Sequence, residues 1–508
     1  MNNPLPNETI YTKTMKKNLP FFGIGSILYA VFYTFCLYKN ASGITYPFFV
    51  TGTLCYFFFS MKKLGVPYKK GSIFYLISIL LLGISNCLTN SFQLLIFNKI
   101  GIFFLTFFLI LHTMYNDSAW NLPEYIIALC RTIGNCFSCL LRPFSDAGFY
   151  FDTQKQEKTD KNSSLIYVFI GILIAIPVLF VTVLLLFTAD AVFADILNNL
   201  FHNVNFKTIF SILFLIIVVS FCSYAAYAGI CMKTVPEKAY DRRTLQPVIA
   251  IIITGALSFV YIIFSSIQIL YLFVGNMQLP DGYTYARYAR EGFFQLLAVC
   301  ILNLLLVLIC LYFFQENTIL KIILTIINGC TYIMILSSAL RMVMYINSYH
   351  LTFLRIFVLW SLAVIFLLIS GITVSIFCPS FPLFSYGIAV ITVCYLILSF
   401  VHPDYWIARY NLTYAVTETD NSYYNSLYYL NSLSADAAPV ILDPEQNPYL
   451  DSIDSMLEHA DDDMVYYTYE NENDMWLYDY YNKIYYSAKY RNIRNFNFSL
   501  YHAEQYLQ

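Results

Sequence analysis

The sequence is poor in charge: only 12% of its 508 residues are Asp, Glu, Lys or Arg, against about 25% in an average soluble domain. Apolar residues make up 59% of the chain. A soluble fold of this size cannot hide so much apolar surface, because folded proteins still expose much of their chain to water. The composition therefore excludes an ordinary soluble domain, predicts the lipid bilayer as the main partner, and gives no reason to expect a nucleic-acid partner.

Cysteine is absent from the last hundred residues, since all 13 cysteines precede residue 403. A disulfide-stapled module is thereby excluded for the only large polar region. The nearest approach to a metal pattern is Cys130, Cys136 and Cys139, but structural zinc normally needs four ligands and no fourth Cys or His stands nearby. We interpret these cysteines as small buried side chains and expect no metal and no cofactor.

Motifs of the common enzyme classes are also missing. The sequence has no Walker-type Gly-Lys-Ser loop, no HExxH and no GxSxG. His402-Pro403-Asp404 is the nearest candidate, and a proline-induced helix end followed by an acidic residue explains it more simply. We therefore expect no catalytic residues and no enzymatic activity.

Long apolar runs fill the first 400 residues, and each can cross about 30 Å of hydrocarbon. Leu165–Ala189, Thr208–Met232 and Gly292–Gln315 contain no Asp, Glu, Lys, Arg or His, whereas the run at 94–112 carries Asn98 and Lys99 in its first turn. We predict an all-α, polytopic integral membrane helical bundle with about 10–11 transmembrane helices and a small polar helical region at the C-terminus. The expected spans are 20–38, 44–61, 72–90, 94–112, 165–188, 208–232, 247–274, 292–314, 319–341, 356–377 and 384–401.

The polar segments between the spans divide the chain into parts. Between spans four and five, Leu122–Leu141 carries an apolar stripe bordered by Arg131 and Arg142, which is typical of an interfacial helix. In the tail, apolar and aromatic residues from Leu477 to Ala488 recur at helical spacing. The predicted parts are a cytoplasmic N-terminus (1–18), a four-helix membrane block (19–112), an amphipathic segment with a linker (113–164), a main membrane domain of about seven helices (165–402) and an acidic, Tyr-rich helical tail (403–508).

The near-neutral net charge of -2 conceals a basic body and an acidic tail. Residues 1–402 have 24 Lys and Arg against 14 Asp and Glu, whereas residues 403–508 have 5 against 17. Loops rich in Lys and Arg alternate with poor ones from the N-terminus onward, which places the N-terminus in the cytoplasm. With eleven spans the tail lies outside the cytoplasm, and one miscounted span reverses its side.

Three groups of ionisable residues lie close to the predicted membrane faces, where charge is costly. Arg287 and Glu291 are four residues apart on one helix face and are able to pair. A binding site or ion gate is one interpretation of the groups; helix-end residues that snorkel to headgroups or cap termini are the other. The candidate residues are Asp190, Asp195, Arg287, Arg290, Glu291, Arg341 and Arg355.

Several stretches carry a resemblance to a known family. They are LLFTADAVFADIL ending at Leu197, YARYAREGFFQLLAV (285–299), RMVMYINSYHLTFLRIFVLW (341–360), HPDYWIARYNL (402–412), YYLNSLSADAAPVIL (428–442) and RNFNFSLYHA (494–503). Together they resemble the bacterial polytopic membrane family called domain of unknown function 4173, which is akin to domain of unknown function 4153. The resemblance implies a plasma-membrane location and one unit that joins the body to the tail. It implies no catalytic or cofactor residues.

Three functions remain open on this basis. The first is a non-enzymatic scaffold or envelope-signalling component whose tail meets a protein partner. The second is a transporter or channel-like protein that uses the charged residues near Asp190, Arg290, Glu291, Arg341 and Arg355. The third is an enzyme that acts on lipid-linked substrates. The sequence predicts neither a substrate nor an oligomeric state.

Overall fold

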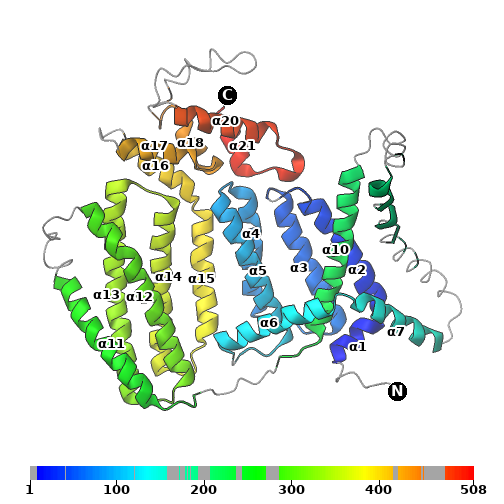
Figure 1. Cartoon of the computed structure of the whole chain (residues 1–508), viewed down its shortest axis with the longest axis horizontal. Coiled ribbons are helices and arrows are strands. Elements are labelled where there is room, and N and C mark those ends of the chain that lie inside the picture. The colour runs from blue at the N-terminus through cyan, green and yellow to red at the C-terminus, as the bar shows by residue number, and fades with distance from the viewer. Residues whose placement is uncertain are drawn as a thin grey trace. The chain divides into compact units, whose positions relative to one another are not determined.

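Helices make up almost all the regular structure. The computed structural model describes residues 9–40, 42–118, 120–156, 206–235, 243–270, 285–415, 422–447, 450 and 475–507, with scattered positions between 171 and 192. Within these ranges the only β-type pairing is an isolated bridge between Leu245 and Phe314. The prediction of an all-α protein is confirmed (Figure 1).

Eight helices of the described part are long and apolar enough to cross a membrane, which confirms a polytopic membrane protein. They are α2 (Leu19–Leu37), α5 (Phe92–Met114), α10 (Phe206–Cys231), α11 (Pro247–Gln268), α12 (Tyr285–Phe313), α13 (Thr318–Tyr349), α14 (Phe353–Phe377) and α15 (Leu383–Phe400).

Two further predicted spans coincide with helices that fall outside this set. α4 (Ser72–Leu88) is apolar but has only 17 residues. α3 (Thr45–Leu64) has 20 residues, but threonines dilute its apolar character and it ends in two lysines. The predicted span at 165–188 lies mostly outside the described residues.

Shorter helices stand at the ends of the spans and in the tail. α6 (Leu122–Ser138) and α7 (Arg142–Gln156) meet at a bend of 65°. The others are α1 (Ile10–Lys17), α16 (Pro403–Ala415), α17 (Ser422–Asn431), η2 (Ala435–Ala437), α18 (Ala438–Ile441), α20 (Met475–Lys489), η3 (Ile493–Asn495) and α21 (Phe498–Glu504).

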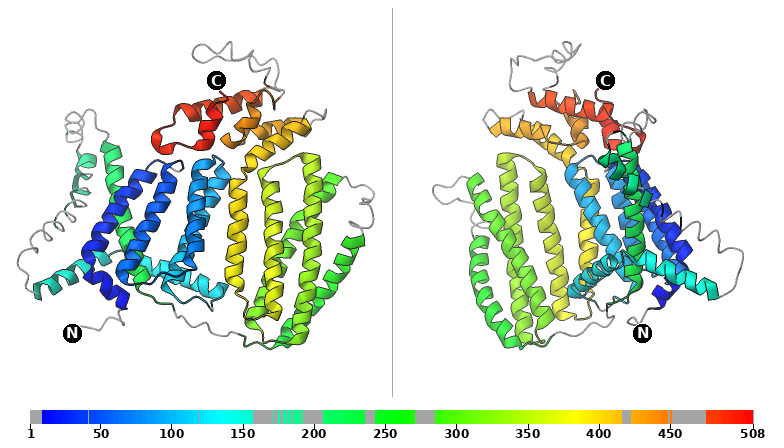
Figure 2. Two further views of the ribbon diagram at one scale, coloured as in Figure 1. Left: turned by 180° about the vertical axis from the view of Figure 1, so that it is seen from behind. Right: turned by 45° about the vertical axis from the view of Figure 1, so that its right-hand side comes forward.

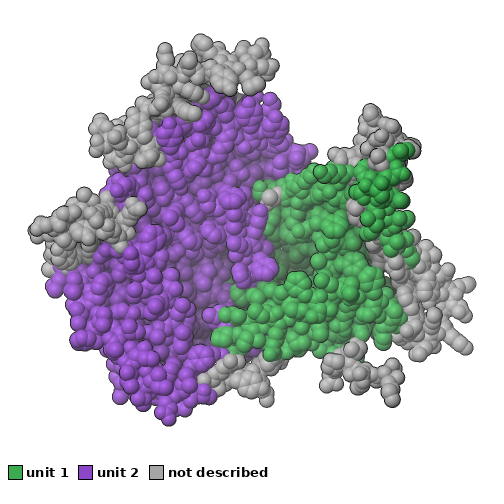
Figure 3. All heavy atoms as spheres, in the orientation of Figure 1, with its two compact units in different colours: residues 1–80, 105–117, 123–237 green, residues 81–104, 118–122, 238–508 purple. Residues whose placement is uncertain are grey.

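The chain forms two compact units, which Figure 3 distinguishes by colour. Unit 1 comprises residues 1–80, 105–117 and 123–237, and unit 2 comprises residues 81–104, 118–122 and 238–508. The division passes through α4 and α5, so each of these helices contributes one half to each unit.

In unit 1, α2 packs between α3 and α10 through aromatic side chains. The Tyr56 ring stacks on Tyr29 and meets Tyr227 of α10 edge-on, with centroids 5.0 and 5.1 Å apart. Gly52 allows this approach, because a Cβ there would lie 2.4 Å from the Phe32 ring. A larger residue at position 52 would separate α2 from α3.

In unit 2, α11, α12 and α14 pack around α13, and polar side chains join neighbouring helices. Asn303 of α12 donates a hydrogen bond to the Thr331 hydroxyl at 3.0 Å, and Asn328 donates to Thr373 of α14 at 2.9 Å. Such hydrogen bonds hold helices together where lipid removes the hydrophobic driving force for their association.

Asn98 of α5 is the centre of another such contact in unit 2. Its side-chain carbonyl accepts hydrogen bonds from Tyr395 at 2.7 Å and Ser399 at 2.8 Å, both on α15. Its amide donates to the Ser85 hydroxyl on α4 at 3.0 Å. The polar residue in the predicted fourth span is therefore fully buried and joins three helices.

The tail helices form a layer across one end of unit 2, which we call the cap end (Figures 1 and 2). This end holds the turn between α4 and α5, the turn between α13 and α14, and the end of α15. The Phe353 amide donates to the Tyr429 hydroxyl at 2.9 Å, and Asn411 accepts from the Leu351 amide at 2.8 Å. The tail therefore continues the fold of unit 2.

Candidate functional site where the tail meets the membrane helices

Asp436 is the central residue of the contact between the tail and the membrane helices. Its carboxylate accepts hydrogen bonds from the Thr89 hydroxyl at 2.5 Å and the Asn90 amide at 2.8 Å, both in the turn between α4 and α5. It also accepts from the Ser499 hydroxyl of α21 at 2.5 Å and lies 3.0 Å from Nδ1 of His402. We call these five residues the Asp436 junction.

The local sequence positions Asp436 in the tail. The Ser434 hydroxyl accepts a hydrogen bond from the Asp436 amide and caps η2, and Pro439 stands in the first turn of α18. Alanines surround the aspartate in the sequence and are themselves buried. Small neighbours let the short helices approach the membrane helices closely, so the Asp436 carboxylate is fully buried.

Asp404 is a second buried acid beside the junction. It is the second residue of α16, which begins at Pro403, and it accepts hydrogen bonds from the Ser434 hydroxyl at 2.6 Å and amide at 3.2 Å. Burial raises the pKa of the Asp404 carboxyl; the Ser434 hydrogen bonds oppose this rise, and the nearby Asp436 adds to it. Two carboxylates thus share one poorly solvated region.

His402 connects the last membrane helix to the tail. It lies between α15 and α16 with φ of +52°, a conformation that few residues other than glycine adopt. The hydrogen bond with Asp436 raises the pKa of His402, and the charges of Asp436 and Asp404 contribute in the same direction, against the opposing effect of burial. The ring remains about one-third exposed, so it exchanges protons with solvent.

We expect tail attachment to weaken as the pH rises. Because the folded state raises the pKa of His402 above 6.5, its contribution to stability is full below the unfolded pKa and is lost as pH rises through the folded pKa. Protease protection of the tail, measured from pH 5.5 to 8.5, should therefore decrease with pH in the wild type. The His402→Asn variant should show a flatter profile, and identical profiles would contradict this role.

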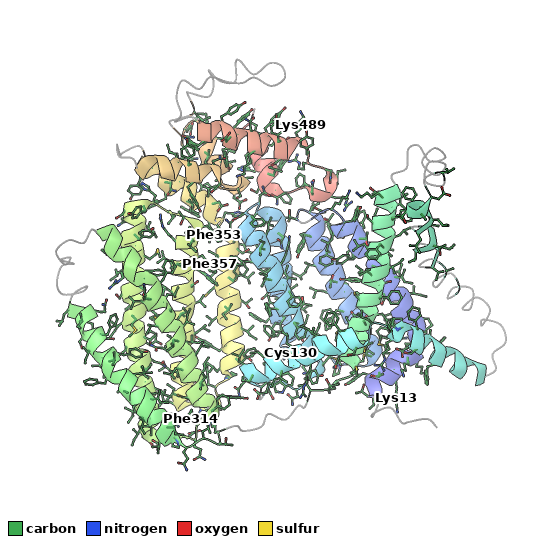
Figure 4. The ribbon with its side chains drawn as sticks, viewed as in Figure 1. Lys13, Cys130, Phe314, Phe353, Phe357 and Lys489 are labelled. Atoms are coloured by element: carbon green, nitrogen blue, oxygen red, sulfur yellow. The ribbon has the colours of Figure 1, made fainter. Side chains whose placement is uncertain are left out.

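Further contacts hold the tail around the junction. The Tyr480 hydroxyl of α20 donates to the Ser434 carbonyl at 2.7 Å, and the Asn497 amide donates to the Thr89 carbonyl at 2.8 Å. Phe353 belongs to the apolar core of the tail and lies beside Phe357 under the tail helices (Figure 4). The junction is therefore enclosed by a core that contains both tail and membrane residues. The buried members of that core include Leu94, Phe353, Ile407, Leu430, Val440, Trp476, Tyr480 and Ala503.

Of the three predicted charged residues whose side chains the structure describes, Asp190, Arg341 and Arg355, only Arg341 is buried. It lies on α13 eight residues before Tyr349 and is 7% exposed. Its guanidinium donates to the Gln268 side chain of α11, which also accepts from Ser337 at 2.6 Å. A Cβ at Gly292 would lie 2.1 Å from the guanidinium, so this glycine makes room for the arginine.

Arg355 binds the end of α13, and Asp190 makes a local contact. The Arg355 guanidinium donates to the carbonyls of Tyr349 and His350 at the end of α13 and lies 4.4 Å from the centroid of the Tyr345 ring. Asp190 accepts a hydrogen bond from the nearby Val192 amide. The described contacts of Arg341 and Arg355 thus involve different residues. The side chains of Arg287, Arg290 and Glu291, and all of Asp195, lie outside the described residues.

Sequence reasoning missed the Asp436 junction. The sequence pattern explains His402 and Asp404 as residues at a helix end. They do lie there, because α15 ends at Phe400 and α16 starts at Pro403. The available signal was Asp436, a lone acid in the apolar stretch ADAAPVIL. Its partners in the chain are 346 and 63 residues away, so no local pattern reveals them.

The chemistry of the junction favours attachment. The four partners of Asp436 together saturate its carboxylate with hydrogen bonds. This is how a buried charge is stabilised. Among the described residues, no group of three His, Cys, Asp or Glu side chains is arranged to hold a metal.

Comparison with known proteins gives one match. No curated protein and no solved structure is similar to this chain at a significant level. The family model described as "Domain of unknown function (DUF4153)" matches residues 76–443, which include His402, Asp404 and Asp436. The sequence resemblance had named domain of unknown function 4173 first and this family as its relative. On the match over most of its length, the chain belongs to the DUF4153 family.

Proposed function

We propose that this protein is a non-enzymatic scaffold or envelope-signalling component of the bacterial plasma membrane, whose tail receives a protein partner. The observation that carries the proposal is the Asp436 junction, which joins the tail to α4, α5 and α15 through a buried charge. A tail held in this way is a rigid platform, and a partner bound to it acts directly on the ends of the membrane helices.

The proposed side of the tail is the extracytoplasmic one. α4 follows the basic loop at Lys62–Gly71, and the turn at its other end contacts the tail through Thr89 and Asn90. A helix that crosses the membrane puts its two ends on opposite sides. Because the basic loop belongs in the cytoplasm by the charge rule, the tail belongs outside.

Topology is tested by labelling single cysteines in intact cells. A cysteine introduced at Lys70 should be protected from an impermeant maleimide, whereas one introduced at the exposed Ile493 should react. External labelling at residue 70 would overturn the orientation and leave the scaffold role to be tested on the other side.

The tail presents apolar and aromatic side chains to solvent, as binding surfaces often do. Tyr485 and Tyr486 lie near the end of α20, and Tyr490 follows its last residue; they are 42%, 53% and 73% exposed. Ile493 is 89% exposed. We call these four residues the exposed tail surface. The rings of its three tyrosines offer a large contact area at low entropic cost.

Photo-crosslinking in cells tests the partner. A photoreactive residue at Tyr490 or Ile493 should give one discrete adduct with a specific envelope protein. The matched control is Gln315, which is exposed at the opposite end of α13, and it should not give that adduct. Full-length folded protein that yields no adduct from any position of the exposed tail surface would count against the proposal.

A transporter is the second candidate function, and the buried Arg341 is the observation that favours it. Ionisable residues inside membrane bundles often mark substrate paths. Under this alternative, Arg341→Lys should abolish uptake of a substrate while leaving the folded protein at wild-type abundance. Under the scaffold proposal the same variant changes stability alone.

A further inference from the structure

α6 and the start of α7 present an apolar stripe whose side chains stay largely exposed within the described part of the chain. Ile126 and Phe137 of α6 are 52% and 70% exposed, and Leu141 at the bend is 75% exposed. Phe144 and Phe149 of α7 are each 51% exposed. The α6 residues recur at helical spacing on one side, so the exposure belongs to a continuous face.

The opposite side of α6 is fixed to unit 1, which determines where the stripe points. The Tyr125 hydroxyl donates to Asp117 at 2.6 Å, and the backbone of Cys136 lies against Gly229 of α10, where a Cβ would approach its amide nitrogen to 2.6 Å. Tyr125, Ala128 and Thr132 are buried on this side. The stripe therefore faces outward because the packing of unit 1 holds it there.

α7 is anchored to the same unit through a buried acid. Asp146 accepts a hydrogen bond from the Tyr224 hydroxyl at 2.9 Å and lies 3.8 Å from the Lys16 amine and 3.6 Å from the Arg142 guanidinium. Placing this group near the centre of a bilayer would be costly. The position of Asp146 thus argues against α6 and α7 acting together as one broken span.

The exposed charged residues that the structure describes on α1, α3 and α6 are positive. Lys13 and Lys17 are exposed on α1, Lys62 and Lys63 end α3, and Arg131 is exposed on α6. Figure 4 labels Lys13 and Cys130 of α6 at the same end of unit 1. Of the described acids here, Asp146 is buried, Asp117 lies 2.9 Å from Nδ1 of His112, and Glu124 in the first turn of α6 is half-buried. An apolar stripe with positive neighbours complements a surface of anionic lipid.

We propose that α6 and the first turns of α7 lie in the plane of the membrane and bind anionic phospholipid of the leaflet at that face. The apolar stripe enters the boundary between headgroups and acyl chains, and the lysines and arginine hold the lipid phosphates. This in-plane anchor is independent of the scaffold role proposed for the tail.

Charge insertion distinguishes an in-plane helix from a span. Leu28 lies at the centre of α2 and is 65% exposed, so it is the matched lipid-facing control within a true span. In nanodiscs, Phe137→Arg should keep the wild-type melting temperature, whereas Leu28→Arg should lower it and reduce the yield of folded protein. Equal losses for both variants would overturn the in-plane position.

Photo-crosslinking in defined nanodiscs tests the lipid. A photoreactive residue at Phe137 should label lipid, with more adduct to phosphatidylglycerol than its share of a mixture with phosphatidylcholine. Replacing Lys13, Lys17 and Arg131 with glutamine should lower this preference by about fivefold per cation at low salt. Replacing Lys489, in the tail, should leave the preference unchanged. Equal labelling of both lipids by the wild type, or adducts to protein alone, would overturn the proposal.

Discussion

Asp436→Asn is expected to release the tail from the membrane helices and to lower the free energy of unfolding by about 3–5 kcal/mol. The asparagine side chain has nearly the same shape, but it carries no charge and one of its oxygens becomes a donor group. In the wild type the Asn90 amide and the Ser499 hydroxyl both donate to the carboxylate. In the variant one of them faces the new NH2 group, which is also a donor. His402 loses its counter-charge in the same substitution.

Thermal unfolding in detergent measures this loss, and limited proteolysis shows whether the tail detaches first. Asp479→Asn is the matched control, because Asp479 is an exposed carboxylate of the same tail and exposed substitutions usually change stability by less than about 0.5 kcal/mol. If both variants melt together with the wild type and resist protease equally, the Asp436 junction does not hold the tail.

Arg341→Ala is expected to cause the second large loss, about 2–5 kcal/mol, because it removes a charged hydrogen-bond donor and a long buried side chain from a polar cluster. The Gln268 carbonyl oxygen keeps only the Ser337 hydroxyl among its described donors, and a cavity opens beside Gly292. The bundle of α11, α12 and α13 should therefore loosen.

Lys63→Ala is the comparison for this variant. Lys63 is exposed, and its described contact is a weak one with the Phe21 ring, 5.9 Å from its centroid, so its loss should cost less than about 1 kcal/mol. Melting temperature and expression in membranes should fall for Arg341→Ala alone. Small and equal effects would show that Arg341 and its polar neighbours do not stabilise the bundle.

Several features of the fold were predictable from short stretches of sequence. The apolar runs of α10 and α12 exceed the length that a bilayer demands, and no soluble core accommodates them. The apolar stripe of α6 and the spacing of Leu477, Tyr480 and Ile484 in α20 were visible for the same reason: helical periodicity is a local property.

The roles of polar residues inside the membrane were not predictable in the same way. In the sequence, the polar Asn98 weakens the prediction of a span at 94–112. In the structure it joins α4, α5 and α15 by three hydrogen bonds. A buried amide is costly when alone and stabilising when satisfied. Whether the amide is costly or stabilising depends on its partners, which lie 13 positions away in the sequence on one side and about 300 on the other.

By itself, then, the sequence determined the class of this protein, eight of its predicted spans and the helical character of its tail, because apolar length and periodicity act within one segment at a time. Tertiary structure alone decided that Asp436 joins the tail to the membrane helices and that Arg355 caps α13. The physical reason is that a charged side chain has no fixed role in the sequence. Its role follows from the donors and acceptors that folding brings within about 3 Å of it.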